Sequence, residues 1–151
     1  DYPPVYTCLA CGLEQVPASL IPSELEDLYK HVVDDTYLEN IPAREKTFAR
    51  CMESLAPYVG KPGTLLEVGS YCGLFLKEAG RRGWVVEGVE PSHWASAYAR
   101  DVTGVNVHSG FLDENVAVLK SSYDLVVSWD VLEHVRDPVK VMNEIYRRIL
   151  S

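Results

Sequence analysis

The sequence lacks any apolar run long enough to cross a membrane, and no signal peptide opens it, so we expect a cytoplasmic protein with no membrane contact. Basic residues are also scarce. The 14 lysines and arginines stand against 22 aspartates and glutamates, which gives a formal net charge of -8 at pH 7. A surface field of that sign repels a phosphate backbone, so nucleic-acid binding is disfavoured.

Cysteine is limited to four residues, and without a secretory signal they indicate free thiols or a metal in a reducing compartment, not a disulfide framework. Cys8 and Cys11 form a CxxC pair, whereas Cys51 and Cys72 stand alone. Internal repeats and low-complexity segments are absent. What remains is a chain of 151 residues, enough for one domain of ordinary size with a core of its own, plus a small appendage.

The hydrophobic pattern predicts an α/β fold with a parallel sheet. Helices are expected at 22–32 and 41–59, after a stretch without periodicity at 1–22. Short apolar strands are then predicted at 64–68, 84–90, 105–110 and 123–129, alternating with helices at 73–83, 91–102 and 137–150. Ligands of such sheets bind beyond the carboxyl ends of the strands, so we expect one site formed by the loops 67–73, 90–93 and 128–134.

The stretch "LLEVGSYCG", residues 65–73, ends the first of these strands in an acid followed by two glycines. The dinucleotide motif G-x-G-x-x-G does not fit, because Tyr71 and Leu74 occupy two of its glycine positions. Glu67 would also repel the phosphates of NAD or ATP. A ligand that carries an ammonium and a sulfonium group reverses that sign, and S-adenosylmethionine is such a ligand.

A second acid, Glu90, closes the next strand, where a carboxylate can accept hydrogen bonds from both hydroxyls of a ribose. The structural alternative is an acid that only caps the helix beginning at Pro91. Two acids that end successive strands, with Gly69 and Gly73 after the first, form a more specific pattern than either acid alone.

Three segments, "LLEVGSYCG", "VEGVEPS" and "YDLVVSWDVLEHVRDP", resemble the class I S-adenosylmethionine-dependent methyltransferases. They are most similar to the subgroup with the motif LEHV (type 11/12-like), which includes ubiquinone-biosynthesis and sugar-modifying enzymes. The resemblance covers residues 41–151 and implies a Rossmann-like domain there. It departs from the family at Tyr71, where the usual loop has a glycine.

The resemblance also implies which residues hold S-adenosylmethionine. The methionyl part would lie on the glycine turn and the carboxyl of Glu67, and the ribose on Glu90. The adenine would lie beside the residues that follow the third strand, and a tryptophan after the fourth strand would pack along the cofactor. The expected residues are Glu67, Gly69, Ser70, Gly73, Glu90, Gly110, Phe111 and Trp129. Arg44, on the helix before the sheet, is a further candidate for the cofactor carboxylate.

The motif "DVLEHV" places Asp130, Glu133 and His134 at i, i+3 and i+4. Three interpretations stay open. His134 is a catalytic base that takes a proton from an acceptor hydroxyl; or the three side chains bind a divalent metal; or Glu133 and His134 only fix the loop through hydrogen bonds.

The first 40 residues resemble the second half of a zinc ribbon, followed by a linker helix. Cys8 and Cys11 would supply two of the four ligands that a structural zinc needs. In related proteins the other pair lies upstream, so zinc is expected only if upstream ligands exist. Because the first residue is Asp1 and not Met, we expect the natural N-terminus to lie upstream.

The family continues with further strands beyond "YRRILS", which here ends the chain. The fourth strand would therefore be an exposed edge, and we expect a partner chain or a missing C-terminal segment to cover it. The predicted function is methyl transfer from S-adenosylmethionine to a small-molecule acceptor, with O-methylation ahead of C- or N-methylation. One alternative is a domain of the same fold that binds the cofactor or acts as a scaffold without catalysis. Another, less well supported, is an interaction module built on the zinc ribbon.

Overall fold

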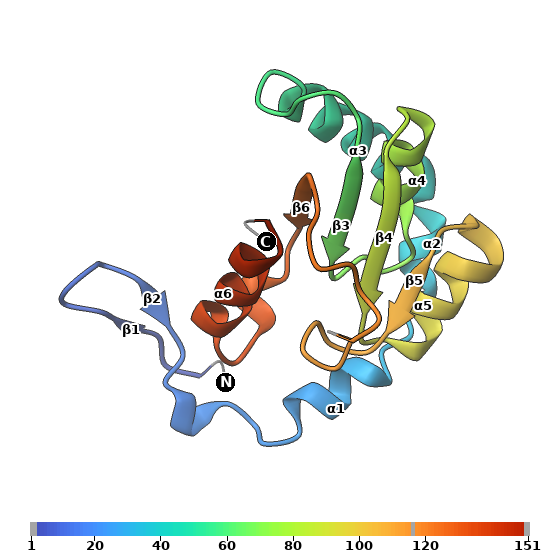
Figure 1. Cartoon of the computed structure of the whole chain (residues 1–151). Coiled ribbons are helices and arrows are strands. Elements are labelled where there is room, and N and C mark those ends of the chain that lie inside the picture. Colours follow the sequence, from blue (N-terminus) through green and yellow to red (C-terminus); the bar gives the residue numbers. More distant parts are fainter. Residues whose placement is uncertain (1–2, 116, 150–151) are drawn as a thin grey trace.

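A sheet of four parallel strands forms the centre of the structure, which is a computed structural model and describes residues 3–115 and 117–149. The strands are β3 (Thr64–Val68), β4 (Val85–Glu90), β5 (Val107–Ser109) and β6 (Leu125–Ser128). Their order is β5-β4-β3-β6 (Figure 1). The chain thus moves outward from β3 to β5 and returns to the other side of β3, which creates a switch point at the carboxyl ends of β3 and β6.

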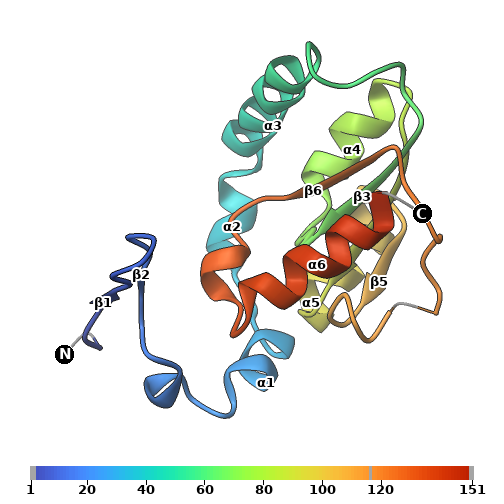
Figure 2. The same cartoon turned by 60° about the vertical axis from the view of Figure 1, so that its left-hand side comes forward.

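Helices cover both faces of this sheet (Figures 1 and 2). One face packs on α3 (Ile41–Leu55), α4 (Leu74–Arg81) and α5 (His93–Tyr98), which continues into a π-helical turn, η2 (Ala99–Thr103). The other face packs on α6 (Pro138–Ile149). The α/β class and the Rossmann-like arrangement predicted from the sequence are therefore confirmed.

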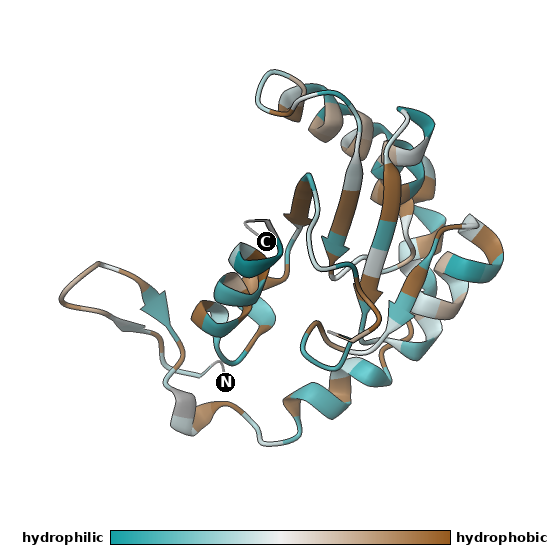
Figure 3. Ribbon diagram, in the orientation of Figure 1, coloured by the Kyte–Doolittle hydropathy of each residue, from teal (hydrophilic) through white to brown (hydrophobic). Residues whose placement is uncertain are grey.

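Alternating side chains of β3 explain why its two leucines stand at successive positions. Leu65 faces the first group of helices and joins Met52 and Phe75 in one core cluster. Leu66 faces the opposite way and joins Ile145 of α6 in a second cluster. A strand buried on both faces needs apolar residues at successive positions, as the hydropathy colouring shows (Figure 3). Each such leucine stabilises the fold by about 1.5–3 kcal/mol.

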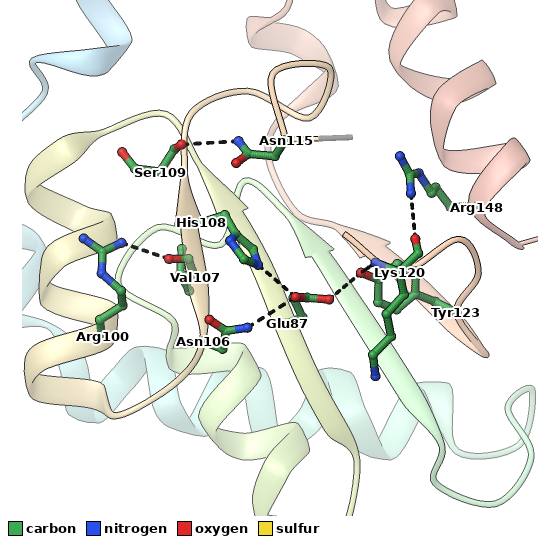
Figure 4. Close-up of polar contacts among 10 residues, drawn as sticks. All are labelled: Glu87, Arg100, Asn106, Val107, His108, Ser109, Asn115, Lys120, Tyr123 and Arg148. Atoms are coloured by element: carbon green, nitrogen blue, oxygen red, sulfur yellow. Dashed lines mark hydrogen bonds and ion pairs between the residues drawn. The ribbon is translucent and has the colours of Figure 1, made fainter. Parts of the chain in front are cut away.

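On the sheet face that packs on α6, β4 and β5 carry a polar network. The described residues between β5 and β6 form turns, so no helix there covers β4 and β5 on the α6 face. On that side Glu87 of β4 accepts hydrogen bonds from Asn106 (3.2 Å), His108 (2.8 Å) and the hydroxyl of Tyr123 (2.5 Å) (Figure 4). These bonds join β4, β5 and the entry of β6 through a single carboxylate.

The N-terminal segment contains several short elements. A hairpin of β1 (Tyr6–Thr7) and β2 (Glu14–Gln15) stands apart from the sheet in both views (Figures 1 and 2). It is followed by a 3-10 turn, η1 (Ala18–Leu20), and by the helices α1 (Leu25–Lys30) and α2 (Asp35–Glu39). In the part of the chain that the structure describes, no helix is long and apolar enough to span a bilayer.

Several helix boundaries differ from the sequence prediction. The helix predicted at 22–32 is limited to Leu25–Lys30, and α2 had no counterpart in the prediction. The helix predicted at 41–59 ends at Leu55, two residues before Pro57, which has no N–H to continue it. The helix predicted at 91–102 begins at His93, because Ser92 caps it by accepting a hydrogen bond from the amide of Ala95.

Candidate active site

A cavity of about 680 Å³ lies at the carboxyl ends of the strands, where the sequence predicted a site. The loops after all four strands of the sheet contribute to its wall, and so do α1 and α3. Its volume is within the usual range for small-molecule sites. Eight of the nine predicted site residues line it: Glu67, Gly69, Ser70, Glu90, Gly110, Phe111, Trp129 and His134.

Glu67 is the most deeply buried acid of the cavity. Its side chain lies at the end of β3, the residue is 2% exposed, and its Oε2 has no hydrogen-bond partner. Burial raises the pKa of Glu67 well above its ordinary value, and the nearby carboxylate of Glu90 raises it further. A buried anion without a counter-charge is strongly disfavoured, so a cation paired with Glu67 would favour its ionised form.

Glu90 lies at the end of β4 and is 5% exposed, but its two oxygens have partners. Oε1 accepts a hydrogen bond from the amide of Ser92, and Oε2 accepts one from the amide of Tyr71, each at 2.8 Å. Burial raises the pKa of Glu90, and the two amides act against that rise. Glu90 therefore ties the glycine loop to the loop after β4, while each oxygen keeps a second lone pair for a ligand.

The glycine turn after β3 lets neighbouring side chains lie close to its backbone. Gly69 has a φ of +76°, and a Cβ placed there would overlap Cγ2 of Val131. Gly73, the ninth predicted residue, has a φ of +73° and a different position. Gly73 lies at the start of α4, where an added Cβ would meet Val105 and Ala99. It is not among the residues that line the cavity. The absence of a side chain at Gly69 lets the cavity loop adopt its positive φ beside Val131. At Gly73 it lets the start of α4 pack closely against Val105 and Ala99.

Tyr71 is the departure from the family pattern, and it has a φ of +45°. The residue lines the cavity, and its ring packs edge to face on Tyr37 with 4.4 Å between centroids. The guanidinium carbon of Arg44 lies over the ring of Tyr37, 3.9 Å from the ring centroid. The rings of Tyr71 and Tyr37 and the guanidinium of Arg44 thus form one wall of the cavity. The positive charge of Arg44 is opposite in sign to that of an ionised Glu67.

The residues after β5 and β6 form another part of the wall. Gly110 has a φ of +119°, and the amide of Phe111 donates a hydrogen bond to Glu114 at 2.8 Å. The ring of Trp129 packs against Phe75 at 5.4 Å, and its buried Nε1 has no hydrogen-bond partner. The family resemblance implied both aromatic residues, Phe111 and Trp129, at this site, and both line the cavity.

The LEHV motif forms a short 3-10 turn, η3 (Leu132–His134). His134 lines the cavity, and its Nδ1 lies 3.1 Å from the hydroxyl of Tyr29. Asp130 lines the cavity with a φ of +53°, whereas Glu133 is exposed outside its wall. Within residues 3–115 and 117–149, no group of three or more His, Cys, Asp or Glu side chains could hold a metal. The metal interpretation of this motif therefore has no support.

The predicted half zinc site lies in the N-terminal hairpin. Cys8 and Cys11 sit in its turn, where Gly12, with a φ of +75°, donates its amide to the carbonyl of Cys8 at 2.8 Å. Both thiols are free, and hydrogen bonds from the backbone of Ala10 and Cys11 lower the pKa of Cys8. In the described chain these two cysteines have no further ligands beside them.

Sequence reasoning did not find the contribution of α1. The cavity is lined by Leu25, Glu26 and Tyr29 of α1 and by Val32 shortly after it, although these residues precede the sheet by more than 30 positions. The only signal in the sequence was the helical pattern at 22–32, which gives no information on where that helix packs.

The fold and the site define an α/β domain that binds a ligand at the switch point of its sheet, with a buried acid suited to a positive charge. The chain belongs to the family of methyltransferase domains, which matches residues 37–150. No curated protein matches the chain detectably in sequence.

Solved structures of methyltransferases have the same fold. A methyltransferase from Thermotoga maritima, a possible histamine N-methyltransferase, is 24% identical over 76% of this chain and 52% of its own, with a TM-score of 0.56. Magnesium protoporphyrin IX methyltransferase from Synechocystis PCC 6803 with bound SAH (S-adenosylhomocysteine) is 17% identical over 82% of this chain and 60% of its own (TM-score 0.57). An Archaeoglobus fulgidus methyltransferase is 20% identical over 77% and 54% (TM-score 0.58). The chain thus spans about half to three fifths of each of these structures.

Proposed function

We infer that the chain is the cofactor-binding part of an S-adenosylmethionine-dependent methyltransferase of the LEHV subgroup, which methylates a small-molecule acceptor. The observation that carries this conclusion is the unpartnered, buried carboxyl of Glu67 beside Glu90. A ligand with an ammonium and a sulfonium group satisfies that carboxyl, whereas the pyrophosphate of a dinucleotide would lie against two acids.

The residues of the cavity fit the parts of this cofactor. Glu67 would pair with the ammonium group, and Arg44 with the carboxylate at the same end. The remaining lone pairs of Glu90 would accept hydrogen bonds from the ribose hydroxyls. Gly110 and Phe111 would border the adenine, with Trp129 along the cofactor. Gly73 would contribute indirectly, by fixing the start of α4 behind the glycine turn.

The bound cofactor would supply a methyl group on a positively charged sulfur, which is already a good leaving group. The protein therefore has to position the acceptor and, for a hydroxyl acceptor, to remove its proton. His134 is the side chain that we assign to this task, because it lines the cavity and an imidazole exchanges protons near neutral pH.

A second candidate is a domain that binds the cofactor without turnover. The unpaired edge of β6 favours it: β3 is the neighbour of β6 on one side, and no described strand pairs with it on the other. A further C-terminal segment or a partner chain would cover this edge and complete the acceptor side. Likewise, upstream cysteines would complete a zinc site with Cys8 and Cys11.

Calorimetric titration of the chain with S-adenosylmethionine, S-adenosylhomocysteine and NAD tests the proposal. We expect saturable binding of the first two ligands and none of NAD. Binding of NAD without binding of S-adenosylmethionine would overturn the assignment. Incubation of the chain with S-adenosylmethionine and a panel of hydroxyl and amine acceptors then separates the active methyltransferase from the domain without turnover. Only the active enzyme converts S-adenosylmethionine to S-adenosylhomocysteine.

A further inference from the structure

Residues 22–32 contribute to the wall of the cavity and precede the matched methyltransferase domain, and we call this segment the strap. In Figure 1 its helix α1 lies at the end of the molecule toward which the arrowheads of β3 and β4 point. Four residues from three loops around the cavity hold it: Arg136 (2.6 Å to the Pro22 carbonyl) and His134 (3.1 Å to Tyr29) after β6, Glu114 (3.1 Å to Lys30) after β5, and Ser92 (2.8 Å to the Val32 carbonyl) after β4.

One of these contacts touches the side chain assigned to proton transfer. The hydroxyl of Tyr29 lies 3.1 Å from Nδ1 of His134, and the two rings meet edge to face with 6.0 Å between centroids. Both residues line the cavity. Burial, and then the carboxylate of Glu133, raise the pKa of Tyr29, so its hydroxyl keeps its proton at neutral pH.

This geometry limits what His134 can do. Nδ1 is occupied by Tyr29, so Nε2 is the ring nitrogen left for an acceptor. A tyrosine hydroxyl can donate or accept a hydrogen bond, so this contact is compatible with either tautomer, and the tautomer decides what Nε2 can do. If Nδ1–H donates to the Tyr29 oxygen, Nε2 has a free lone pair and can act as a base; the opposite tautomer could only donate.

We propose that Tyr29 is a positioning residue which holds His134 in the Nδ1–H tautomer, so that the strap completes the proton-accepting part of the site. This inference rests on the proposed function. During transfer to a hydroxyl acceptor, the acceptor O–H bond breaks and its proton bonds to Nε2. The acceptor oxygen uses the released electron pair for its bond to the methyl carbon, and the pair of the broken carbon–sulfur bond stays on sulfur. Nδ1–H remains bonded to Tyr29 throughout.

Nitrogen-15 NMR of the histidine rings tests the inference without any acceptor. The chain has four histidines, and His134→Asn identifies the signals of His134 by their loss. At pH 8, where an ordinary imidazole (pKa about 6.5) is neutral, we expect Nδ1 of His134 to carry the proton. In Tyr29→Phe, which keeps the ring and removes only the hydroxyl, the proton should move to Nε2. Tyr146→Phe is the matched control, because Tyr146 is exposed on α6, away from the cavity.

Two results would overturn the inference: an Nε2–H tautomer in the unaltered protein, or an unchanged His134 tautomer in Tyr29→Phe. The first needs no variant, so it applies even if Tyr29→Phe folds poorly. Titration with S-adenosylmethionine separates this outcome from failure of the proposed function. Absence of binding to the unaltered protein would reject the methyltransferase assignment, whatever the tautomer.

Discussion

Binding of a cationic cofactor should release a proton from Glu67. The residue is 2% exposed, its Oε2 has no partner, and burial raises its pKa well above the ordinary 4.5. Its carboxyl group should therefore stay protonated through the window between 4.5 and the raised pKa, in which an ordinary glutamate is ionised. An ammonium group that pairs with Glu67 must displace that proton, so the affinity should increase with pH across the window.

The size of the effect follows from the linkage. Release of one proton changes the affinity by up to tenfold per pH unit, or about 1.4 kcal/mol, within the window. The Glu67→Gln variant keeps the shape of the side chain and removes the charge. A hydrogen bond to a charged group contributes about 1.5–3 kcal/mol, so the variant should bind S-adenosylmethionine about 10- to 150-fold more weakly. Its affinity should no longer depend on pH through this group.

The raised pKa of Glu67 should also make the stability of the ligand-free protein depend on pH. Stability should decrease with rising pH, whereas the affinity for the cofactor should increase. Within the window the native state holds a proton on Glu67 that the unfolded state has lost. The free energy of unfolding therefore decreases as pH rises from 4.5 to the raised pKa. Glu67→Gln should lack this part of the decrease in urea unfolding measured over the same pH range.

Calorimetric titrations in two buffers with different ionisation enthalpies, at several pH values, measure the released proton directly. Glu87→Gln is the matched control, because Glu87 is a largely buried acid on β4 with three hydrogen-bond partners outside the cavity. It should leave proton release unchanged. Tight binding with no proton release and no pH dependence in the unaltered protein would refute the reasoning, since it would mean that the ligand displaces no proton from Glu67.

Two further predictions concern stability and can be checked by urea unfolding. Gly69→Ala should lower the free energy of unfolding by about 1–3 kcal/mol, because it adds a Cβ at a φ of +76° against Val131. Adding Val131→Ala should restore only the part of this loss that comes from the overlap with Val131, and not the part that comes from the positive φ. An unchanged free energy of unfolding in Gly69→Ala would contradict the role of the glycine. Tyr123→Phe should cost about 1–3 kcal/mol, because Glu87 loses the hydroxyl bonded to its Oε2. The same cost in a Glu87→Ala background, which leaves no acceptor at this position, would show that this bond is not the cause.

The elements that could be predicted from the sequence are those with a strong local pattern. The four apolar strands and their alternation with helices determined the parallel sheet, because a strand buried on both faces needs continuous apolar residues. The end of α3 near Pro57 and the start of α5 at Ser92 depend on single capping and breaking residues, which shift a helix boundary by a few positions.

The sequence by itself also determined that Glu67 and Glu90 share one site, because the carboxyl ends of neighbouring parallel strands meet at one edge of the sheet. Only the tertiary structure decided how they differ: Glu90 accepts two backbone amides, while Glu67 keeps an unpartnered oxygen. It also decided that Tyr29 meets His134, 105 residues further along the chain. Hydrophobic periodicity records which side of an element is buried, but it carries no information on which distant side chain packs there.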